Sequence, residues 1–321
     1  MTPVRHLITG GAGFIAANLA QALIARGDFV VAVDDLSRGS MSLLRDLSPS
    51  PAFRFHQQDC ADVEGLHAVV RSLEGQIDEV WHLAANSDIP AGVEDARVDL
   101  HRTFMTTFAT LEVMKRAGIP TLHFASSSAV YGDRGDEAVG EDSGPLRPIS
   151  NYGAMKLASE AQISAAQEAF LDRADIFRFP NVVGAPATHG AILDFIGKLR
   201  RDPTRLEVLG NGRQQKPYLH VQELVAAMLH IRTIPGRGEL VNIGPDDDGV
   251  TVARIAQAVR DHVSPSASIV YGQKAAGWVG DVPRFRYLTR RLSDLGWRSA
   301  LSSEQAIMRA VMEITAQEEM S

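Results

Sequence analysis

Short runs of β-branched and aromatic residues alternate with longer helical segments along the first 180 residues of this 321-residue chain, and this alternation constrains the fold most. The short runs are HLITG (6–10), FVVAVDD (29–35), FRFHQQD (53–59), EVWHLAA (79–85), TLHFASS (121–127) and DIFRFP (175–180). Strands that alternate with helices form βαβ units, in which helices cover both faces of a parallel sheet. The chain is therefore predicted to be an α/β protein with a doubly wound parallel sheet.

The pattern changes after Pro180, where loop-like stretches flank the short helical segment ILDFIGKLRR. Further on, VQELVAAMLHIR, ELVNIGP and VTVARIAQAVRDHV are typical of a helix, a strand and a helix that could return to the main sheet. We therefore expect one domain from residues 1–180, to which 219–260 return. A smaller, discontinuous α/β domain is expected from 181–218 and 261–321.

Composition limits the classes of partner. The net charge of −7 is spread along the chain, whereas a nucleic-acid surface needs a basic stripe. Cys60 is the only cysteine, so no internal disulfide can form, in keeping with a reducing, cytoplasmic compartment. No apolar run reaches the roughly 18 residues of a membrane span, and the apolar run at the N-terminus is too short for a signal peptide. We expect a soluble protein with no nucleic-acid partner, no membrane partner and no metal.

The stretch TGGAGFIAANL (9–19) places glycines between a predicted strand and a predicted helix. Gly10 and Gly13 would let the backbone approach a pyrophosphate, and a helix that starts near Phe14 would offer free N–H groups. Asp34 ends the next strand, where a carboxylate can bind ribose hydroxyls and would repel a 2′-phosphate. This context favours an NAD site over an ordinary tight turn. Arg38 is the one sign in favour of NADP.

A second constellation carries reactive groups. NYGAMK (151–156) places Tyr152 and Lys156 four residues apart, on one face of a predicted helix. Ser127 lies 152 − 127 = 25 residues before Tyr152, at the end of a predicted strand. A phenol with a pKa near 10 becomes a base at neutral pH only when its phenolate is stabilised by roughly 4 kcal/mol, which a nearby ammonium can supply. The alternative is an amphipathic surface helix with a solvated lysine.

Together the glycine turn, SSSAVYG (126–132) and NYGAMK resemble the extended short-chain dehydrogenase/reductases, specifically the NAD-dependent epimerase/dehydratase family. The resemblance implies a Rossmann-like fold and catalytic roles for Ser127, Tyr152 and Lys156. Ala16 stands where the family has a third glycine, and it is small enough for close packing. The residues that the resemblance places around NAD are Gly10, Gly13, Phe14, Ile15, Asp34, Asp35, Leu36, Ser37, Asp59, Cys60, Leu83, Ala84, Ala85, Tyr152 and Lys156. Cys60 and the neighbouring His82 could equally be buried core residues.

The residues after Ser127 limit the classes of reaction that the resemblance implies. Dehydratases and decarboxylases of the family carry an acidic residue where Ser128 and Ala129 stand here, so simple hydride removal and return is expected. The stretches RFPNVVGAPATHG, LEVLGNGRQQKPYLHV and GWVGDV resemble nucleotide-sugar epimerases, most of all the UDP-glucose (UDP-galactose) 4-epimerase group. That resemblance implies substrate contacts from Ser127, Ser128, Tyr152, Asn181, Lys216, Tyr218, Trp278 and Asp281. Trp278 could instead be a packed loop aromatic.

The chain departs from this group at three positions. Lys216 replaces an arginine and so loses its bidentate fork, Pro217 replaces a polar residue, and Thr103 replaces an asparagine. We predict an NAD-dependent 4-epimerase of UDP-glucose and UDP-galactose. The alternatives are an epimerase of UDP-glucuronate or a UDP-N-acetylhexosamine, an NDP-sugar ketoreductase and, as an unfavoured case, a non-enzymatic NAD-binding protein. The resemblance also implies a homodimer through helices around 93–117 and 152–170.

Overall fold

The computed structural model describes residues 3–273 and 282–319, and the chain divides into two compact units. The first comprises Met1–Val130, Pro148–Arg178 and Met228–Val241, and the second Tyr131–Arg147, Phe179–Ala227 and Asn242–Ser321. Both units are discontinuous in sequence, so the chain passes between them several times.

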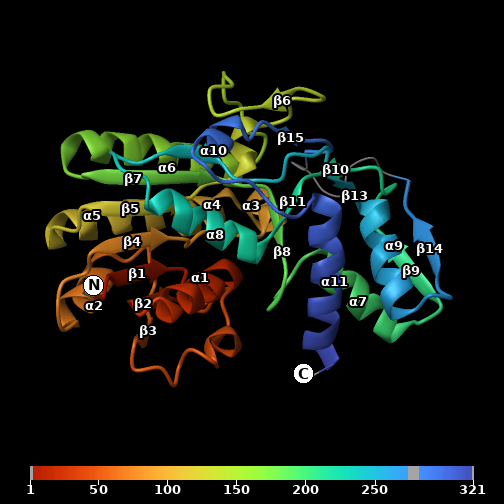
Figure 1. The fold of residues 1–321 in the computed structure, drawn as a ribbon, viewed down its shortest axis with the longest axis horizontal. Coiled ribbons are helices and arrows are strands. Elements are labelled where there is room, and N and C mark those ends of the chain that lie inside the picture. The colour runs from red at the N-terminus through yellow and green to blue at the C-terminus, as the bar shows by residue number, and fades with distance from the viewer. Residues whose placement is uncertain (1–2, 274–281, 320–321) are drawn as a thin grey trace. The chain divides into compact units, whose positions relative to one another are not determined.

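The first unit contains a seven-stranded sheet in the order β12–β7–β5–β4–β1–β2–β3 (Figure 1). Its strands are β1 (Arg5–Thr9), β2 (Phe29–Asp34), β3 (Phe53–Gln57), β4 (Glu79–His82), β5 (Thr121–Ala125), β7 (Arg173–Arg178) and β12 (Leu240–Asn242). Neighbouring strands from β3 to β7 pair in parallel. The strand order reverses beside β1, because the chain adds β2 and β3 on one side and β4, β5 and β7 on the other. The predicted doubly wound α/β fold is confirmed.

One face of this sheet is apolar. Alternate strand residues such as Leu7, Val80 and Phe124 are buried there in a single hydrophobic cluster with Leu66 and Ile163 of the covering helices. The helices on this face are α2 (Val63–Ser72), α5 (Thr106–Ala117) and α6 (Asn151–Ala169). The other helical segments of this unit are α1 (Phe14–Ala25), η1 (Met41–Leu44), α3 (Ile89–Glu94), α4 (Ala96–Asp99), the π-helix η2 (Leu100–Met105), the start of the 3₁₀ turn η3 (Ser128–Tyr131) and the end of α8 (Val221–Arg232).

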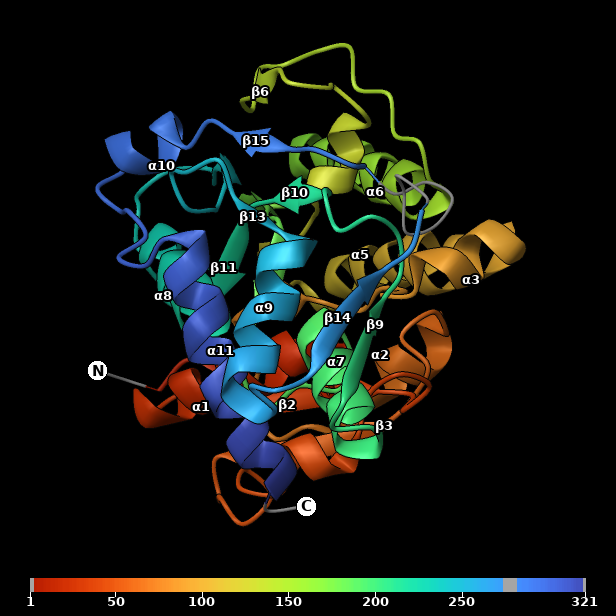
Figure 2. The same cartoon turned by 90° about the vertical axis from the view of Figure 1, so that its right-hand side faces the viewer.

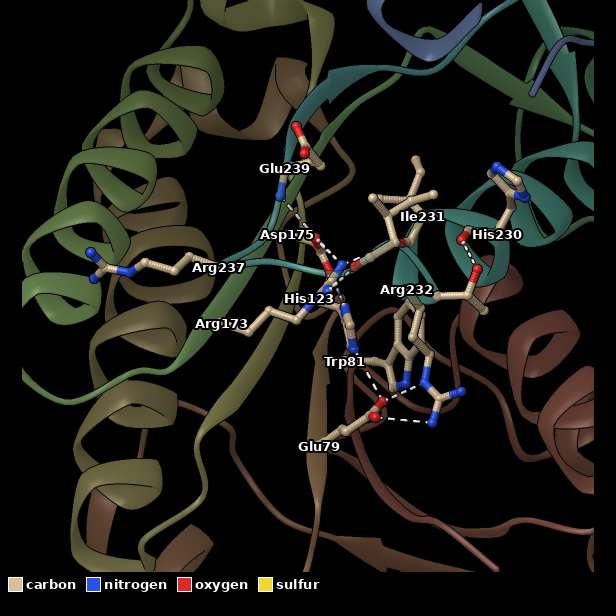
Figure 3. Close-up of polar contacts among 12 residues, drawn as sticks. Glu79, Trp81, His123, Arg173, Asp175, His230, Ile231, Arg232, Arg237 and Glu239 are labelled. Atoms are coloured by element: carbon tan, nitrogen blue, oxygen red, sulfur yellow. Dashed lines mark hydrogen bonds and ion pairs between the residues drawn. The ribbon is translucent and has the colours of Figure 1, made fainter. Parts of the chain in front are cut away.

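The opposite face is polar where β4, β5 and β7 meet (Figure 3). His123 lies between two carboxylates, 3.1 Å from Glu79 and 2.8 Å from Asp175. Arg232, at the end of α8, donates to Glu79 at 2.6 and 2.9 Å, while Arg173 donates to Asp175 at 2.8 and 2.9 Å. Each buried charge thus faces an opposite charge, which offsets the desolvation that burial imposes.

A π-helix precedes α5. The π-helix η2 occupies Leu100–Met105, and α5 begins at Thr106 and ends before the left-handed Gly118. Hydroxyls compete for the backbone here: Thr106 Oγ1 donates to the carbonyls of Arg102 and Thr103, and Thr107 Oγ1 also donates to Thr103. Threonine hydroxyls that bond to preceding carbonyls perturb helices in this way.

The second unit is a smaller α/β assembly (Figure 2). Its elements are β6 (Ala138–Val139), β8 (Asn181–Val183), α7 (Ala191–Arg201), β9 (Arg205–Val208), β10 (Gln215–Lys216), β11 (Tyr218–His220), β13 (Val250–Thr251), α9 (Val252–Val263), β14 (Ser268–Tyr271), β15 (Arg286–Tyr287), α10 (Arg290–Asp294) and α11 (Ser303–Glu319). The strands form two-stranded sheets: β8 with β11, β9 with β14, β10 with β13 and β6 with β15. Ile196 of α7, Leu206 of β9, Ile255 of α9 and Ala310 of α11 are each fully or almost fully buried in one cluster.

Candidate active site

The glycine turn joins β1 to α1 as the sequence predicts. Gly10 has a φ of +71°, and a Cβ added to it would lie 2.7 Å from the backbone nitrogen of Ala84, so only glycine fits this close approach. Gly13 is the N-cap of α1 and provides no side-chain hydrogen bond to the first turn. The N–H groups at the start of this 12-residue helix are therefore left uncapped by a side chain, as an anion site requires.

Asp34 fixes the loop that follows β2. Its carboxylate accepts hydrogen bonds from the backbone nitrogens of Ala12 at 3.1 Å and Leu36 at 2.8 Å. Leu36 has a φ of +62°, a left-handed conformation that is uncommon outside glycine. Burial raises the pKa of Asp34, although the two backbone bonds oppose this effect. Each carboxylate oxygen keeps a further lone pair for a ribose hydroxyl.

Two other residues expected near the cofactor, Asp59 and Cys60, differ in their burial. Cys60 is buried in the apolar cluster with its Sγ 3.6 Å from the carbonyl oxygen of Val33, and burial raises the pKa of the thiol to about 12. Asp59 is more exposed, and its carboxylate accepts from Ala61 N at 2.8 Å and lies 3.1 Å from His101. Cys60 is therefore a neutral core thiol, whereas Asp59 keeps a carboxylate at the surface.

The end of β4 passes directly beneath the glycine turn. Ala84 is the residue that a side chain at Gly10 would strike, and Leu83 and Ala85 flank it. His82 is fully buried, 2.6 Å from the hydroxyl of Thr9 and 2.9 Å from that of Thr107. Burial, followed by the charge of Lys156, lowers the pKa of His82 to about 3. This histidine is a neutral core residue that is satisfied by hydroxyls.

The structure brings Ser127, Tyr152 and Lys156 together within the first unit. Ser150 caps α6 by accepting from Gly153 N at 3.1 Å, so Tyr152 lies in the first turn. A Cβ on Gly153 would lie 2.5 Å from the carbonyl oxygen of Ala129, which means that the turn containing Ser127 packs directly on the start of α6. A hydrogen bond with Ser127 acts on the Tyr152 phenol.

Lys156 lies one helical turn below Tyr152. Its side chain is 2% exposed, and Nζ donates to the carbonyl oxygen of Ala125 at 2.5 Å and lies 5.9 Å from the centre of the Tyr152 ring. Burial lowers the pKa of Lys156 to about 7. Burial also raises the pKa of Tyr152 to about 12, although the hydrogen bond with Ser127 acts to lower it. With this pKa Tyr152 is a protonated phenol near neutral pH, and a nearby positive charge would favour the phenolate.

Sequence reasoning missed a buried ion pair beside these residues. Arg178, at the end of β7, donates to Glu160 through Nε at 2.9 Å and Nη2 at 2.5 Å. The hydroxyl of Ser126, next to Ser127, also donates to Glu160. Glu160 lies four residues after Lys156, so this spacing on one helix face was the available signal. The pair fixes the strand end that presents Ser127.

The remaining substrate candidates fall into three groups. Ser128 belongs to the 3₁₀ turn η3 next to Ser127, in the first unit. Asn181 in β8 is exposed, Lys216 in β10 is half-buried, and Tyr218 in β11 packs into the core cluster of the second unit. Trp278 and Asp281 lie outside the described residues. Thr103, where an asparagine was expected, is buried in η2 and its hydroxyl accepts from Asn86 N at 3.1 Å.

The described residues contain neither a metal-binding cluster nor a membrane-spanning helix. No three histidine, cysteine, aspartate or glutamate side chains within 3–273 and 282–319 are grouped so that they could hold a metal ion. Across the same residues, every helix is too short or too polar to cross a bilayer.

The sequence model described as "NAD dependent epimerase/dehydratase family" matches residues 6–244, which include the glycine turn, Ser127 and the Tyr152–Lys156 pair. The chain belongs to this family. Among relatives, the UDP-glucose 4-epimerase of Mycolicibacterium smegmatis is 28% identical over 317 residues, covering 96% of this chain and 97% of that protein.

Solved structures agree with this family assignment. A crystal structure of a UDP-galactose 4-epimerase is 33% identical with a TM-score of 0.84, covering 98% of this chain and 99% of that one. The Thermus thermophilus UDP-glucose 4-epimerase in complex with NAD is 26% identical with a TM-score of 0.85, covering 97% and 99%. The chain therefore spans these relatives almost end to end.

The family's cofactor, NAD, fits the residues of the first unit. Gly10 and the uncapped start of α1 provide a close backbone approach for a diphosphate. Asp34, at the carboxyl end of β2, provides a carboxylate for a ribose. The adjoining β1 lies where the strand order reverses, which is where ligands bind in open α/β sheets.

Proposed function

We propose that this protein is an NAD-dependent nucleotide-sugar 4-epimerase that interconverts UDP-glucose and UDP-galactose. The observation that carries the proposal is the hydrogen bond between Ser127 and Tyr152, one helical turn from Lys156, with Ser128 and Ala129 following where the reaction would need a carboxylate to eliminate water or carbon dioxide. The names of the epimerase relatives support the same reaction and substrate class.

In the proposed mechanism Tyr152 moves a proton at the 4-hydroxyl of the sugar. Its phenolate takes the hydroxyl proton during oxidation, and the phenol returns it when the sugar is reduced again. Ser127 orients the 4-oxygen by a hydrogen bond, and the Lys156 ammonium favours the phenolate electrostatically. NAD, which Gly10 and Asp34 would help to hold, would supply a reversible hydride acceptor at C4, so the sugar would undergo no net redox change.

The residues that we propose to hold NAD are Gly10, Gly13, Phe14, Ile15, Asp34, Asp35, Leu36, Ser37, Asp59, Cys60, Leu83, Ala84, Ala85, Tyr152 and Lys156. For Cys60, whose thiol is buried and neutral, the proposed contribution is packing beneath the nucleotide. The proposed sugar-nucleotide contacts are Ser127, Ser128, Tyr152, Asn181, Lys216, Tyr218, Trp278 and Asp281. Tyr218 would contribute through its exposed edge, since most of its side chain is buried.

We also propose a cytoplasmic homodimer, formed through α5 and α6. Leu111, Val113 and Met114 are used inside the core of the first unit. Phe104 and Phe108 remain partly exposed on the same helical stretch. They supply apolar area for a second subunit.

The decisive experiment incubates the purified protein with UDP-glucose or UDP-galactose without added cofactor. Each sugar should convert to the other, and substrate deuterated at C4 should keep its label in the product. Tyr152→Phe should slow conversion by roughly 10²–10⁴-fold, as expected for loss of a general acid/base, and should leave NAD bound.

Other products would point to the alternatives. Conversion of UDP-glucuronate or a UDP-N-acetylhexosamine alone would identify a different epimerase, and stoichiometric free NADH would identify a dehydrogenase or ketoreductase. A 4-keto-6-deoxy sugar or a pentose would contradict the assignment altogether. No turnover of any nucleotide sugar, with NAD bound, would identify a non-enzymatic NAD-binding protein.

A further inference from the structure

Asp99, at the end of α4, is a fully buried acid outside the proposed catalytic set. Its Oδ1 accepts a hydrogen bond from Nδ2 of Asn86 at 2.9 Å. Its Oδ2 is buried and has no hydrogen bond of ordinary geometry among the residues that the structure describes, although the Thr103 hydroxyl also acts on the carboxyl group. A buried carboxyl group with so few donors costs free energy, so its retention calls for a physical reason.

The packing around Oδ2 leads directly to the start of α6. A Cβ on Gly92 would lie 1.7 Å from Asp99 Oδ2, so the carboxyl group occupies the space that a side chain at position 92 would fill. The carbonyl oxygen of Gly92 accepts a hydrogen bond from Nδ2 of Asn151 at 2.7 Å. Asn151 immediately precedes Tyr152. The backbone against which Asp99 packs therefore also holds the end of the helix that carries Tyr152.

We propose that Asp99 is a positioning residue that sets the charge balance of the Tyr152–Lys156 pair across the contact between α4 and α6. It acts through these two side chains and touches neither substrate nor cofactor. The proposal rests on the proposed function only in its kinetic test, because the charge coupling exists in the protein without any ligand.

Electrostatics gives this coupling a direction. Burial lowers the pKa of Lys156, while the charges of Glu160 and Asp99 raise it. Burial raises the pKa of Tyr152, the hydrogen bond from Ser127 lowers it, and the charge of Asp99 raises it again. Ionised Asp99 thus favours a protonated lysine beside a protonated tyrosine, and it discourages an uncompensated phenolate in the resting site.

Several titratable groups surround Asp99. Burial raises the pKa of Asp99 itself, Asn86 and Thr103 lower it, Asp88 raises it and Lys156 lowers it. The titratable groups that face this cluster from the packed elements are Asp88 before α3, Tyr152, Lys156 and Glu160 on α6, and His82 at the end of β4. His82 stays neutral, and the charges of Glu160 and Asp99 favour the protonated form of Lys156.

The test is a titration of Lys156 in the protein as purified, by ¹³C NMR of lysine labelled at Cε and assigned with Lys156→Met. In the wild type Lys156 should titrate near its pKa of about 7. Asp99→Asn keeps the volume and removes the charge, so the titration should move down by about one pH unit. Because a purely structural role would not move it, an unchanged titration in a folded Asp99→Asn protein overturns the proposal.

Glu94→Gln is the matched control, because it removes an exposed carboxylate on α3 and should leave the Lys156 titration in place. If Asp99→Asn does not fold, Asp99→Ser removes the same charge with a smaller side chain and is judged by the same shift. The wild-type protein gives a third readout: the Asp99 carboxyl carbon should respond as Lys156 titrates, and a flat response contradicts the coupling.

Kinetics separates this proposal from the proposed function. With UDP-galactose as substrate, the alkaline limb of the kcat/KM profile should move to lower pH by about one unit in Asp99→Asn, so activity falls up to about tenfold above pH 7. A shifted NMR titration in a protein that turns over no nucleotide sugar supports the coupling and refutes the epimerase. If Asp99→Asn is an active epimerase in which neither the Lys156 titration nor the kcat/KM profile moves, the coupling is refuted and the proposed function is supported.

Discussion

Glu79→Gln tests whether the buried ion network of Figure 3 stabilises the sheet. Glu79 opens β4, and its side chain is 17% exposed between His123 and Arg232. Burial alone would raise the pKa of Glu79, but hydrogen bonds and charges from His123 and Arg232 lower it to about 2. Glutamine keeps the shape of the side chain and removes the charge, so Arg232 loses its counter-ion and His123 loses a charged hydrogen-bond partner.

The expected loss of folding free energy follows from the linkage between protonation of Glu79 and folding. A fall in the Glu79 pKa from 4.5 to about 2 corresponds to about 3 kcal/mol of folding free energy at 1.36 kcal/mol per unit. The folded pKa is the lower one, so this stability is fully present well above pH 4.5 and is lost as pH falls toward 2. About 1.4 kcal/mol should already be lost at pH 3.5, where the unfolded side chain is mostly protonated.

Urea unfolding at pH 7 and pH 3.5 measures the effect, with the fluorescence of Trp81 as probe, because its ring stacks on His123 at 4.0 Å. Glu79→Gln should be less stable than wild type by about 3 kcal/mol at pH 7 and by distinctly less at pH 3.5. Glu64→Gln is the control, since Glu64 also pairs with an arginine, Arg116, but its side chain is 76% exposed. The free energy of unfolding of Glu64→Gln should match that of the wild type at both pH values. A Glu79→Gln deficit that is the same at both pH values would refute the electrostatic account.

Two further predictions concern the cofactor and the assembly. Asp34→Ala should purify with much less NAD, measured by mass spectrometry of the native protein, while Asp46→Ala, at an exposed aspartate outside the proposed NAD set, should keep it; full occupancy in Asp34→Ala would place the ribose contact elsewhere. Sedimentation at micromolar concentration should give a dimer for the wild type and a monomer for Phe108→Glu, because the partly exposed ring of Phe108 would face the second subunit. A wild-type protein that sediments only as a monomer would exclude the proposed interface.

The nucleotide turn and the reactive residues could be predicted because their signals are local. Gly10 and Gly13 follow a strand and begin a helix, and Tyr152 and Lys156 are one helical turn apart. Ser127 is predicted from the family resemblance, because the family's catalytic serine lies at a strand end 25 residues before the tyrosine, 152 − 127. In each case the chemistry lies within one turn or at the end of one strand, where spacing alone fixes the geometry.

The polar face of the sheet could not be predicted in the same way. Glu79, His123 and Asp175 come from three strands far apart in sequence, and each strand alone resembles an ordinary buried strand. Only the strand register places His123 beside Asp175, and Trp81 beside His123. A shift of one residue in any of these pairings would move a charge to the apolar face, so the network also fixes the register that it depends on.

The roles of Asp99 and Gly92 could not be predicted from sequence spacing. An aspartate in a short polar helix is ordinarily solvated, and a glycine seven residues earlier is an ordinary turn residue, so neither carries a local signal. Their importance comes from α6, whose Asn151 binds the carbonyl oxygen of Gly92 and draws that backbone over the carboxyl group. The charge on Asp99 acts on Tyr152 and Lys156 because tertiary packing removes the water that would screen it. In the proposed mechanism the motif residues would supply the chemistry, and Asp99, outside the motif, would adjust the pH at which that chemistry can operate.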